Sequence, residues 1–157
     1  MSLSCCLTYE TDKTPFLYDD SCGAVRADHP MWPQQSGVYY FEVTIEECSG
    51  HGYVACSSNP FPVPYGIRLT VTSSSSRRAA FGIGFCEEHT SLGMHLGWTE
   101  GAWGYHGDDG NIYNKGGTGT AWGPRYEVGD TVGCGVNFDK GIAFYTRNGK
   151  VLGEQIS

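Results

Sequence analysis

The sequence predicts an all-β protein folded as an antiparallel β-sandwich. Short segments in which apolar and polar residues alternate recur along the chain, and glycine-rich turns separate them. No segment of useful length shows the helical period. The 157 residues include 23 glycines and 13% aromatic residues but only 17% charged ones, a composition that suits short strands joined by tight turns. The length is that of one domain, which we place at residues 1–157.

The first well-marked strand is predicted at residues 38–46, with the sequence VYYFEVTIE. Its odd-numbered positions carry apolar side chains, namely Tyr39, Phe41, Val43 and Ile45. Because successive side chains of a strand point to opposite faces, these four form a continuous apolar face. The pattern therefore predicts a strand with one face against a core.

A second strand is predicted at residues 81–86, with the sequence FGIGFC. Three apolar side chains share one face of this strand, and glycines, including Gly84, occupy the other. Glycine inside a strand marks a place where another backbone or a large aromatic ring approaches closely. We therefore expect a neighbouring chain segment to lie against the glycine face.

The C-terminal part of the chain predicts two consecutive antiparallel strands, at residues 131–138 and 141–147, with a turn at residues 139–141. Asn148 and Gly149 follow directly. This pair is a strong hairpin signal, because both central positions of a type I′ turn need a positive φ. A return strand is expected immediately after it.

The most informative stretch for function is residues 96–114, LGWTEGAWGYHGDDGNIYN. It places large aromatic side chains around a polar turn at residues 107–110, and these are Trp98, Trp103, Tyr105 and Tyr113. Tyr and Trp supply contact area at low entropic cost, so they concentrate where protein partners dock. The stretch favours a binding module over an enzyme.

Asp108 and Asp109 form the tip of that turn. The alternating acidic spacing of a calcium loop is absent, and no partner for a catalytic carboxylate pair stands at an identifiable spacing. We expect a turn in which the Asp side chains accept hydrogen bonds from nearby backbone amides. A catalytic set could be written from Cys86, His106 and Asp109, but no nucleophile motif supports it. We therefore predict no enzymatic activity.

The composition limits the kinds of partner that the protein can bind and indicates the cellular compartment in which it occurs. The formal charge of −7 argues against binding to nucleic acid, and no apolar stretch reaches membrane-spanning length. The seven cysteines are odd in number and lack the spacing of zinc ligands. Neither a metal nor a cofactor is expected. Free thiols indicate a reducing compartment, so we expect a cytoplasmic protein, with the nucleus as a second location.

One segment does not fit the strand pattern. Residues 50–79 contain Pro60, Pro62 and Pro64 and then a run of four serines. Proline lacks the ladder donor and a serine run buries nothing. We therefore interpret residues 50–79 as an inserted loop, which is either disordered or translated from a retained intron.

Several motifs together resemble one family. They are VRADHP, GVYYFEV and FGIGFC in the first half of the chain, followed by LGW, WGYHGDDG, GTGTAWGP, GDTVGCGVNF and FYTRNGKVLG. This order is similar to that of the SPRY domain and, within it, of the RanBPM-like branch. The resemblance implies a bent, concanavalin-like sandwich of two antiparallel sheets. Relatives of this kind lack the insert and continue beyond the NGKVLG hairpin, so we expect the sandwich to be incomplete at the C-terminus.

The resemblance also implies a function. SPRY domains are non-catalytic modules that bind a protein or a short peptide segment, and RanBPM-like proteins scaffold a CTLH-type ubiquitin ligase. We therefore expect a substrate or adaptor receptor, with ubiquitin-ligase subunits among its partners. Two alternatives stay open, namely a secreted SPRY-type effector that binds host proteins and a truncated fragment without function.

Partner-binding residues are expected in loops. SPRY peptide sites are built from the segment before VRADHP, the segment after FGIGFC and the turn near LGW. By this resemblance, the partner-binding residues expected in this sequence are Tyr18, Asp19, Glu87, His89 and Trp98.

Overall fold

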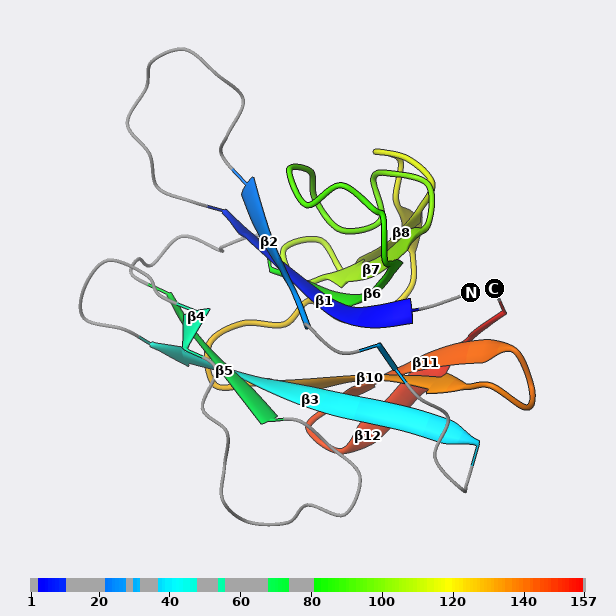
Figure 1. The fold of residues 1–157 in the computed structure, drawn as a ribbon. Helices are drawn as coiled ribbons and strands as arrows, with labels where there is room; N and C mark the ends of the chain where they lie inside the picture. Colours follow the sequence, from blue (N-terminus) through cyan, green and yellow to red (C-terminus); the bar gives the residue numbers. More distant parts are fainter. Residues whose placement is uncertain are drawn as a thin grey trace. The chain divides into compact units, whose positions relative to one another are not determined.

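The computed structural model of the chain describes residues 3–10, 22–27, 30–31, 37–47, 54–55, 68–73 and 81–156. This described part forms twelve strands and no helix, and the strands make two six-stranded sheets (Figure 1). The all-β prediction is confirmed. The chain divides into two compact units, one made of Met1–Met31 with Arg77–Arg125 and the other of Trp32–Ser76 with Tyr126–Ser157.

The first unit holds the sheet with the order β2-β1-β6-β7-β8-β9, and every neighbouring pair in it is antiparallel. Its strands are β1 (Leu3–Glu10), β2 (Cys22–Arg26), β6 (Gly82–Glu87), β7 (Ala102–His106), β8 (Asn111–Asn114) and β9 (Thr120–Ala121).

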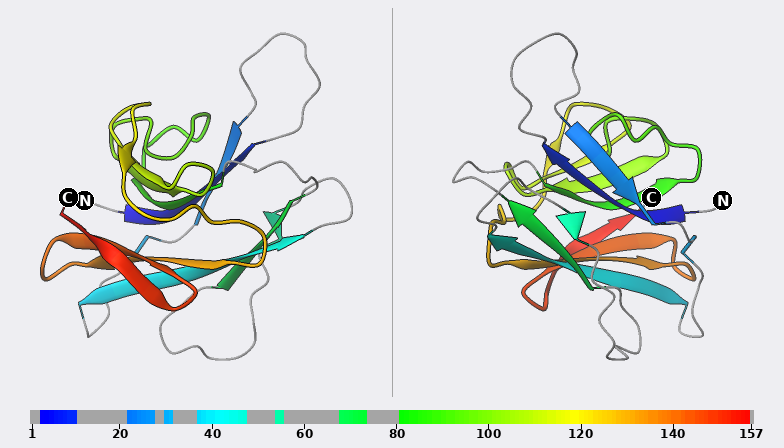
Figure 2. Two further views of the ribbon diagram at one scale, coloured as in Figure 1. Left: turned by 180° about the vertical axis from the view of Figure 1, so that it is seen from behind. Right: turned by 60° about the vertical axis from the view of Figure 1, so that its left-hand side comes forward.

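The second unit holds the sheet with the order β12-β11-β10-β3-β5-β4. Its strands are β3 (Val38–Glu47), β4 (Val54–Ala55), β5 (Arg68–Ser73), β10 (Thr131–Asn137), β11 (Ile142–Arg147) and β12 (Lys150–Ile156). Two further views show β12 at one edge of this sheet (Figure 2). The pair β3–β5 is parallel, which departs from the antiparallel pattern that the sequence predicts.

The core of the second unit follows the predicted alternation. Phe41, Val43 and Ile45 of β3 are buried, and so are Val132, Cys134 and Val136 of the adjacent β10. Burial of each such side chain stabilises the fold by roughly 1.5–3 kcal/mol before the entropy of ordering is subtracted. The predicted hairpin is also present, because Asn148 and Gly149 have φ values of 51° and 76° between β11 and β12.

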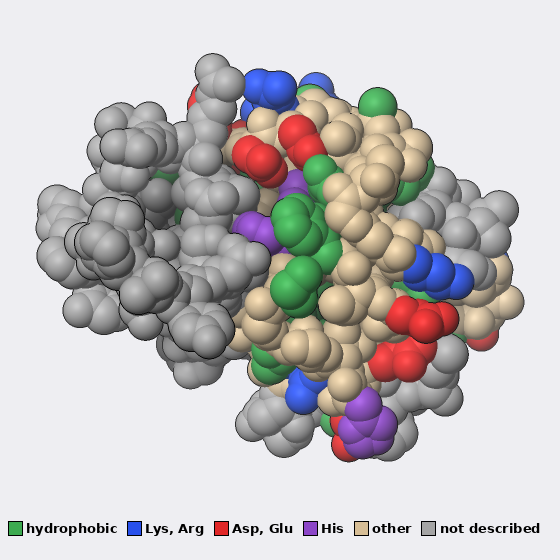
Figure 3. Space-filling view, turned by 90° about the horizontal axis from the view of Figure 1, so that it is seen from above, with side chains coloured by type: hydrophobic (Ala, Val, Ile, Leu, Met, Phe, Trp, Pro, Cys, Tyr) green, Lys and Arg blue, Asp and Glu red, His purple; other side chains and the backbone are tan. Residues whose placement is uncertain are grey.

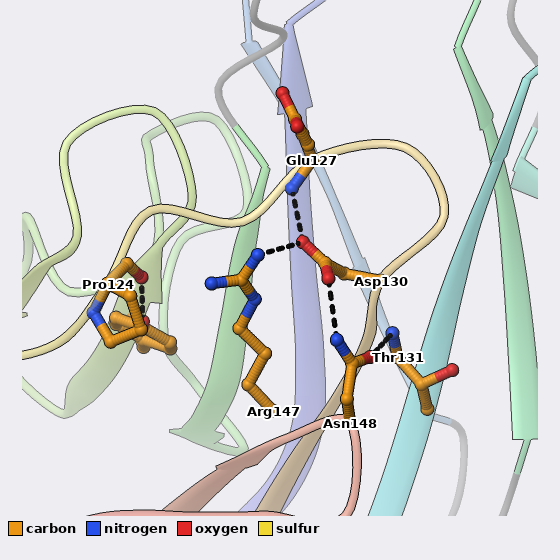
Figure 4. Close-up of polar contacts among 7 residues, drawn as sticks. Pro124, Glu127, Asp130, Thr131, Arg147 and Asn148 are labelled. Atoms are coloured by element: carbon orange, nitrogen blue, oxygen red, sulfur yellow. Dashed lines mark hydrogen bonds and ion pairs between the residues drawn. The ribbon is translucent and has the colours of Figure 1, made fainter.

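A polar network closes the loop in front of β10. The Asp130 carboxylate accepts hydrogen bonds from Arg147 Nη2 at 2.9 Å, from Asn148 Nδ2 at 2.8 Å and from the Glu127 backbone N–H at 2.9 Å (Figure 4). The Thr131 backbone N–H in turn donates to Asn148 Oδ1 at 2.9 Å. The network therefore ties the loop to the turn between β11 and β12.

The glycine face of β6 is used as the sequence predicts. Gly84 pairs with Gly104 of β7, and a Cβ atom at Gly84 would lie 1.9 Å from the backbone oxygen of Trp103. The aromatic ring of Trp103 stacks on Phe85 with centroids 5.1 Å apart. A side chain at Gly84 would therefore separate the two strands.

The prediction for residues 50–79 needs a correction. Strands β4 and β5 both lie inside this range, so it is not wholly an inserted loop. The sequence RLTVTS of β5 alternates apolar and threonine residues and is rich in β-branched types, which favour strands. Because the range as a whole is rich in proline and serine, the sequence pattern did not predict this short strand.

Candidate functional site

The candidate site is built on the loop between β6 and β7. The two ends of this loop are joined, because the Glu87 backbone N–H donates to the Gly101 carbonyl at 2.8 Å. The Thr90 hydroxyl donates to the same carbonyl at 3.1 Å, and Arg26 Nη1 of β2 donates to the Thr90 carbonyl at 3.2 Å. Three hydrogen bonds therefore fix where the loop leaves the sheet.

The middle of the loop lies on β7. The Leu96 carbonyl oxygen would be 2.5 Å from a Cβ atom at Gly104, so only glycine leaves room for it there. The same carbonyl accepts a hydrogen bond from His106 Nε2 at 2.8 Å. Because a carbonyl cannot donate, His106 carries its proton on Nε2. The Leu96 carbonyl thus holds the loop against β7 at two positions of the strand, Gly104 and His106.

Four aromatic rings close into a cycle above this attachment, and we call His95, Trp98, His106 and Tyr113 the aromatic cluster. Ring centroids are 4.7 Å apart for His95 and Trp98, and 6.3 Å for Trp98 and Tyr113. They are 4.3 Å apart for Tyr113 and His106, and 5.9 Å for His106 and His95. Every pair is tilted, by 39° to 52°. Contacts of this kind stabilise the arrangement beyond the area that they bury.

Glycines allow the cluster to pack tightly around Tyr113. A Cβ atom at Gly119 would lie 2.6 Å from Cζ of the Tyr113 ring, and one at Gly97 would lie 2.4 Å from the Tyr113 carbonyl oxygen. Gly97 also has a φ of 89°, a conformation that favours glycine. The loop and β8 are therefore in direct backbone contact.

The turn between β7 and β8 supports the same ring. Asp109 accepts hydrogen bonds from the Asn111 backbone N–H at 2.8 Å, from Asn111 Nδ2 at 2.9 Å and from the Tyr113 hydroxyl at 2.6 Å. The backbone bond is the Asx turn that the sequence predicts. Asp108 makes no such bond, and its Oδ1 is buried without a partner among the described residues.

Burial shapes the protonation of the cluster. It lowers the pKa of His106 below the usual 6.5, against the opposing effect of the hydrogen bond to Leu96. Burial also raises the pKa of Tyr113, and the hydrogen bond to Asp109 raises that pKa further. A neutral imidazole and a neutral phenol therefore form the inner side of the cluster at neutral pH.

The outer side of the cluster is open to solvent. Trp98 is 36% exposed and Met94 of the same loop is 42% exposed, although both side chains are large and apolar. In the view from above, hydrophobic side chains gather beside histidine and acidic ones (Figure 3). Exposed aromatic and thioether side chains next to charges are typical of protein-binding surfaces.

The structure separates the predicted site residues. Trp98 lies in the aromatic cluster, Glu87 is half-buried at the end of β6 and His89 is exposed in the turn that follows. Neither Glu87 nor His89 forms a hydrogen bond, ion pair or ring contact with Trp98. Tyr18 and Asp19 lie outside the described residues. The predicted binding role of all five stays a prediction.

His95, His106 and Tyr113 were not predicted as site residues. Their assembly depends on the pairing of Gly104 with Tyr113 across β7 and β8 and on the course of the loop. The density of aromatic residues over positions 96–114 is the signal that points to His106 and Tyr113, and His95 directly precedes that stretch.

The three residues of the conceivable catalytic set do not form one. Cys86 is fully buried with Cys6, Leu96 and Ala102, whereas His106 bonds the Leu96 carbonyl. A hydrogen bond from Cys6 lowers the pKa of Cys86 to about 7, and Arg26 adds to this effect against the opposing burial. The set lacks the nucleophile–base–carboxylate contacts of a triad.

Among the described residues, no group of three or more His, Cys, Asp or Glu side chains is arranged to hold a metal ion. Nor does that part of the chain contain a helix of the length and apolar character needed to cross a membrane. Of its cysteines, Cys6, Cys86 and Cys134 are buried and form no disulfide.

Comparison with known proteins identifies relatives. The SPRY domain family matches residues 65–156. Ran-binding protein 9 of Danio rerio is 35% identical over 141 residues, which cover 90% of this chain and 18% of that protein. Its counterpart in Homo sapiens is 34% identical over 141 residues, which cover 90% of this chain and 15% of that protein.

A plant relative and a solved structure extend the comparison. Ran-binding protein M homolog of Arabidopsis thaliana is 29% identical over 138 residues, or 88% of this chain and 24% of that protein. A crystal structure of a human SPRY domain is 33% identical with a TM-score of 0.43, and it covers 45% of this chain and 47% of that chain. The chain spans less than a quarter of the length of the three curated relatives.

Proposed function

This chain belongs to the SPRY domain family, and from that premise we propose that the aromatic cluster receives the chain's protein partner. The family and the Ran-binding relatives support a protein-interaction module that binds a protein or a peptide, and not an enzyme. The observation that carries the proposal is that Trp98 is exposed on a loop whose Leu96 carbonyl is hydrogen-bonded to His106 of β7. Preformed aromatic surfaces lose little entropy on binding.

The finer role that we propose is that of a substrate or adaptor receptor of a RanBPM-like ubiquitin-ligase scaffold. Support comes from the similarity to Ran-binding proteins 9 and 10 across most of the chain. Cytoplasm is the proposed compartment, with the nucleus second. In this role the SPRY domain captures a segment of the incoming protein, and the remaining parts of the scaffold present that protein to the ligase.

Affinity capture tests the proposal. The chain is immobilised and its bound proteins from a cell extract are compared with those of Trp98→Ala. We expect the substituted chain to lose most of its specific partners, because truncating a central aromatic side chain of an interface commonly costs about 2 kcal/mol or more. Ubiquitin-ligase subunits among the lost partners would support the finer role.

Two controls separate binding from folding. Val128→Ala removes an exposed apolar side chain from the second unit, and we expect it to keep the partners. Circular dichroism and thermal melting of Trp98→Ala establish that the substituted chain is folded. Capture of the same partners by a folded Trp98→Ala chain would refute the assignment of this surface.

A further inference from the structure

We propose that the aromatic cluster recognises a positively charged side chain, an arginine or a lysine, within the partner segment. The cation would lie over the exposed side of the Trp98 ring, with Asp108 and Asp109 supplying the attracting charge. The inference rests on the proposed function, because it specifies the chemistry of the partner at that same surface.

The Trp98 ring has two aromatic neighbours among the described residues. His95 and Tyr113 contact it at tilts of 51° and 43°, and the Trp98 residue is 36% exposed. No lysine or arginine of the described residues stacks on it. A Cβ atom added at Gly117 would lie 3.9 Å from Cδ2 of the Trp98 ring, so the segment that follows Lys115 passes close to this ring. Tryptophan is the aromatic residue that binds cations best, so this ring is available to a cation from outside.

The segment that forms the cluster carries more acidic than basic side chains. Residues 81–125 contain the acidic residues Glu87, Glu88, Glu100, Asp108 and Asp109 and the basic residues Lys115 and Arg125, which gives five negative and two positive charges. None of the five carboxylates forms an ion pair with a described lysine or arginine. The single ion pair between described residues joins Arg147 and Asp130 in the other unit. Residues 81–125 therefore carry an excess of three negative charges, with Arg26 of β2 as a further positive group at the start of the loop, and this excess favours a positively charged partner.

One of these acidic side chains contacts the aromatic cluster directly. Asp109 bonds the Tyr113 hydroxyl at 2.6 Å, and Asp108 precedes it in the turn. Oδ1 of Asp108 is buried and lacks a donor among the described residues. Because the Tyr113 ring lies 6.3 Å from the Trp98 ring between centroids, a guanidinium or ammonium group over Trp98 would meet an aromatic face, with the charge of the Asp108–Asp109 turn acting on it from beyond Tyr113, and both effects favour a cation over a neutral side chain.

Peptide selection tests the inference. A random-sequence peptide library is selected on the full chain, with the folded Trp98→Ala chain used for counter-selection. We expect the peptides that need Trp98 to be enriched in arginine or lysine. Each arginine of the strongest binder is then replaced by citrulline, an uncharged side chain of nearly the same shape. We expect about two- to fivefold weaker binding at the critical position, as for an exposed cation–π contact.

Charge is tested separately on the protein. Asp108→Asn removes a charge without removing a hydrogen bond between described residues, so we expect it to weaken the arginine peptide and leave the citrulline peptide unchanged. Raised salt should reduce the difference between the two peptides. Absence of Trp98-dependent peptides, selection of acidic or uncharged ones, or equal binding of arginine and citrulline peptides would each overturn the inference. Trp98-dependent capture of cellular partners together with equal peptide binding would leave the proposed function standing.

Discussion

The Tyr113 hydroxyl donates a 2.6 Å hydrogen bond to Asp109, which joins the aromatic cluster to the tip of the turn between β7 and β8. Asp109 also fixes the turn itself through the Asn111 backbone N–H. One carboxylate therefore sets both the shape of the turn and the position of a ring in the candidate site. Hydrogen bonds to an ionised group are stronger than those between neutral groups.

We predict that Asp109→Ala lowers the free energy of unfolding by about 1–3 kcal/mol, because three donors lose their acceptor. Urea denaturation measures this change. Asp108→Ala is the matched control, since no described residue donates to it, and its effect should stay within about 0.5 kcal/mol. Equal losses for the two neighbours would show that the hydrogen bonds of Asp109 contribute little.

Gly104→Ala tests how the loop is attached to β7. The added Cβ atom would meet the Leu96 carbonyl oxygen at 2.5 Å, so the loop or the strand must move. Overpacking of this kind costs about 1–3 kcal/mol, and we expect partner binding to weaken along with stability. Gly116→Ala is the control, because nothing lies within 4 Å of a Cβ atom there. A thermal melt of Gly104→Ala that matches the unsubstituted chain would contradict this account.

Asp130→Ala should destabilise the second unit. The substitution removes the acceptor of Arg147, Asn148 and the Glu127 backbone N–H, and Asp130 is only 7% exposed. We expect a loss of about 2–4 kcal/mol, because charged and partly buried donors are left without a partner. Denaturant unfolding gives the value, and Lys140→Ala in an exposed turn serves as the control. Partner capture per folded molecule should not change.

The low pKa of His106 predicts the pH dependence of stability. In the unfolded chain the imidazole titrates near 6.5, whereas burial keeps the folded pKa lower. As the pH falls below 6.5, the unfolded chain takes up the proton first, so stability is lost between the unfolded and the folded pKa. The stability that depends on neutral His106 is fully present above pH 6.5. Denaturation midpoints measured across this window should fall in the original chain and in His89→Gln, but much less in His106→Gln.

Much of the fold could be predicted from the sequence because local patterns determined it. The alternation in β3, the glycine face of β6 and the Asn148–Gly149 turn each have one good structural solution. The structure of residues 50–79 was harder to predict, because β5 pairs in parallel with β3, which lies more than twenty residues away in the sequence. Proline and serine content reports on local backbone preference and carries no information about such pairing.

The site could be predicted only in part. Trp98 was predicted because the resemblance to SPRY domains implies a peptide site at the turn near LGW, whereas the ring neighbours of Trp98 were not predicted as site residues. His95 and His106 are far apart in the pattern of strands and loops, and they meet because the loop folds back onto β7. The loop can fold back in this way only because Gly104 leaves space for the Leu96 carbonyl. The alternation of apolar and polar residues in the sequence does not show this contact.

The attachment at Leu96 uses main-chain atoms on the loop side. It follows that the outward side chains near Met94 and Trp98 could be rewritten, or a whole loop transplanted from a relative, while the carbonyl over Gly104 keeps its place. Evolution and protein engineering could thus retarget the domain by exchanging this segment and leave the sheet beneath it untouched.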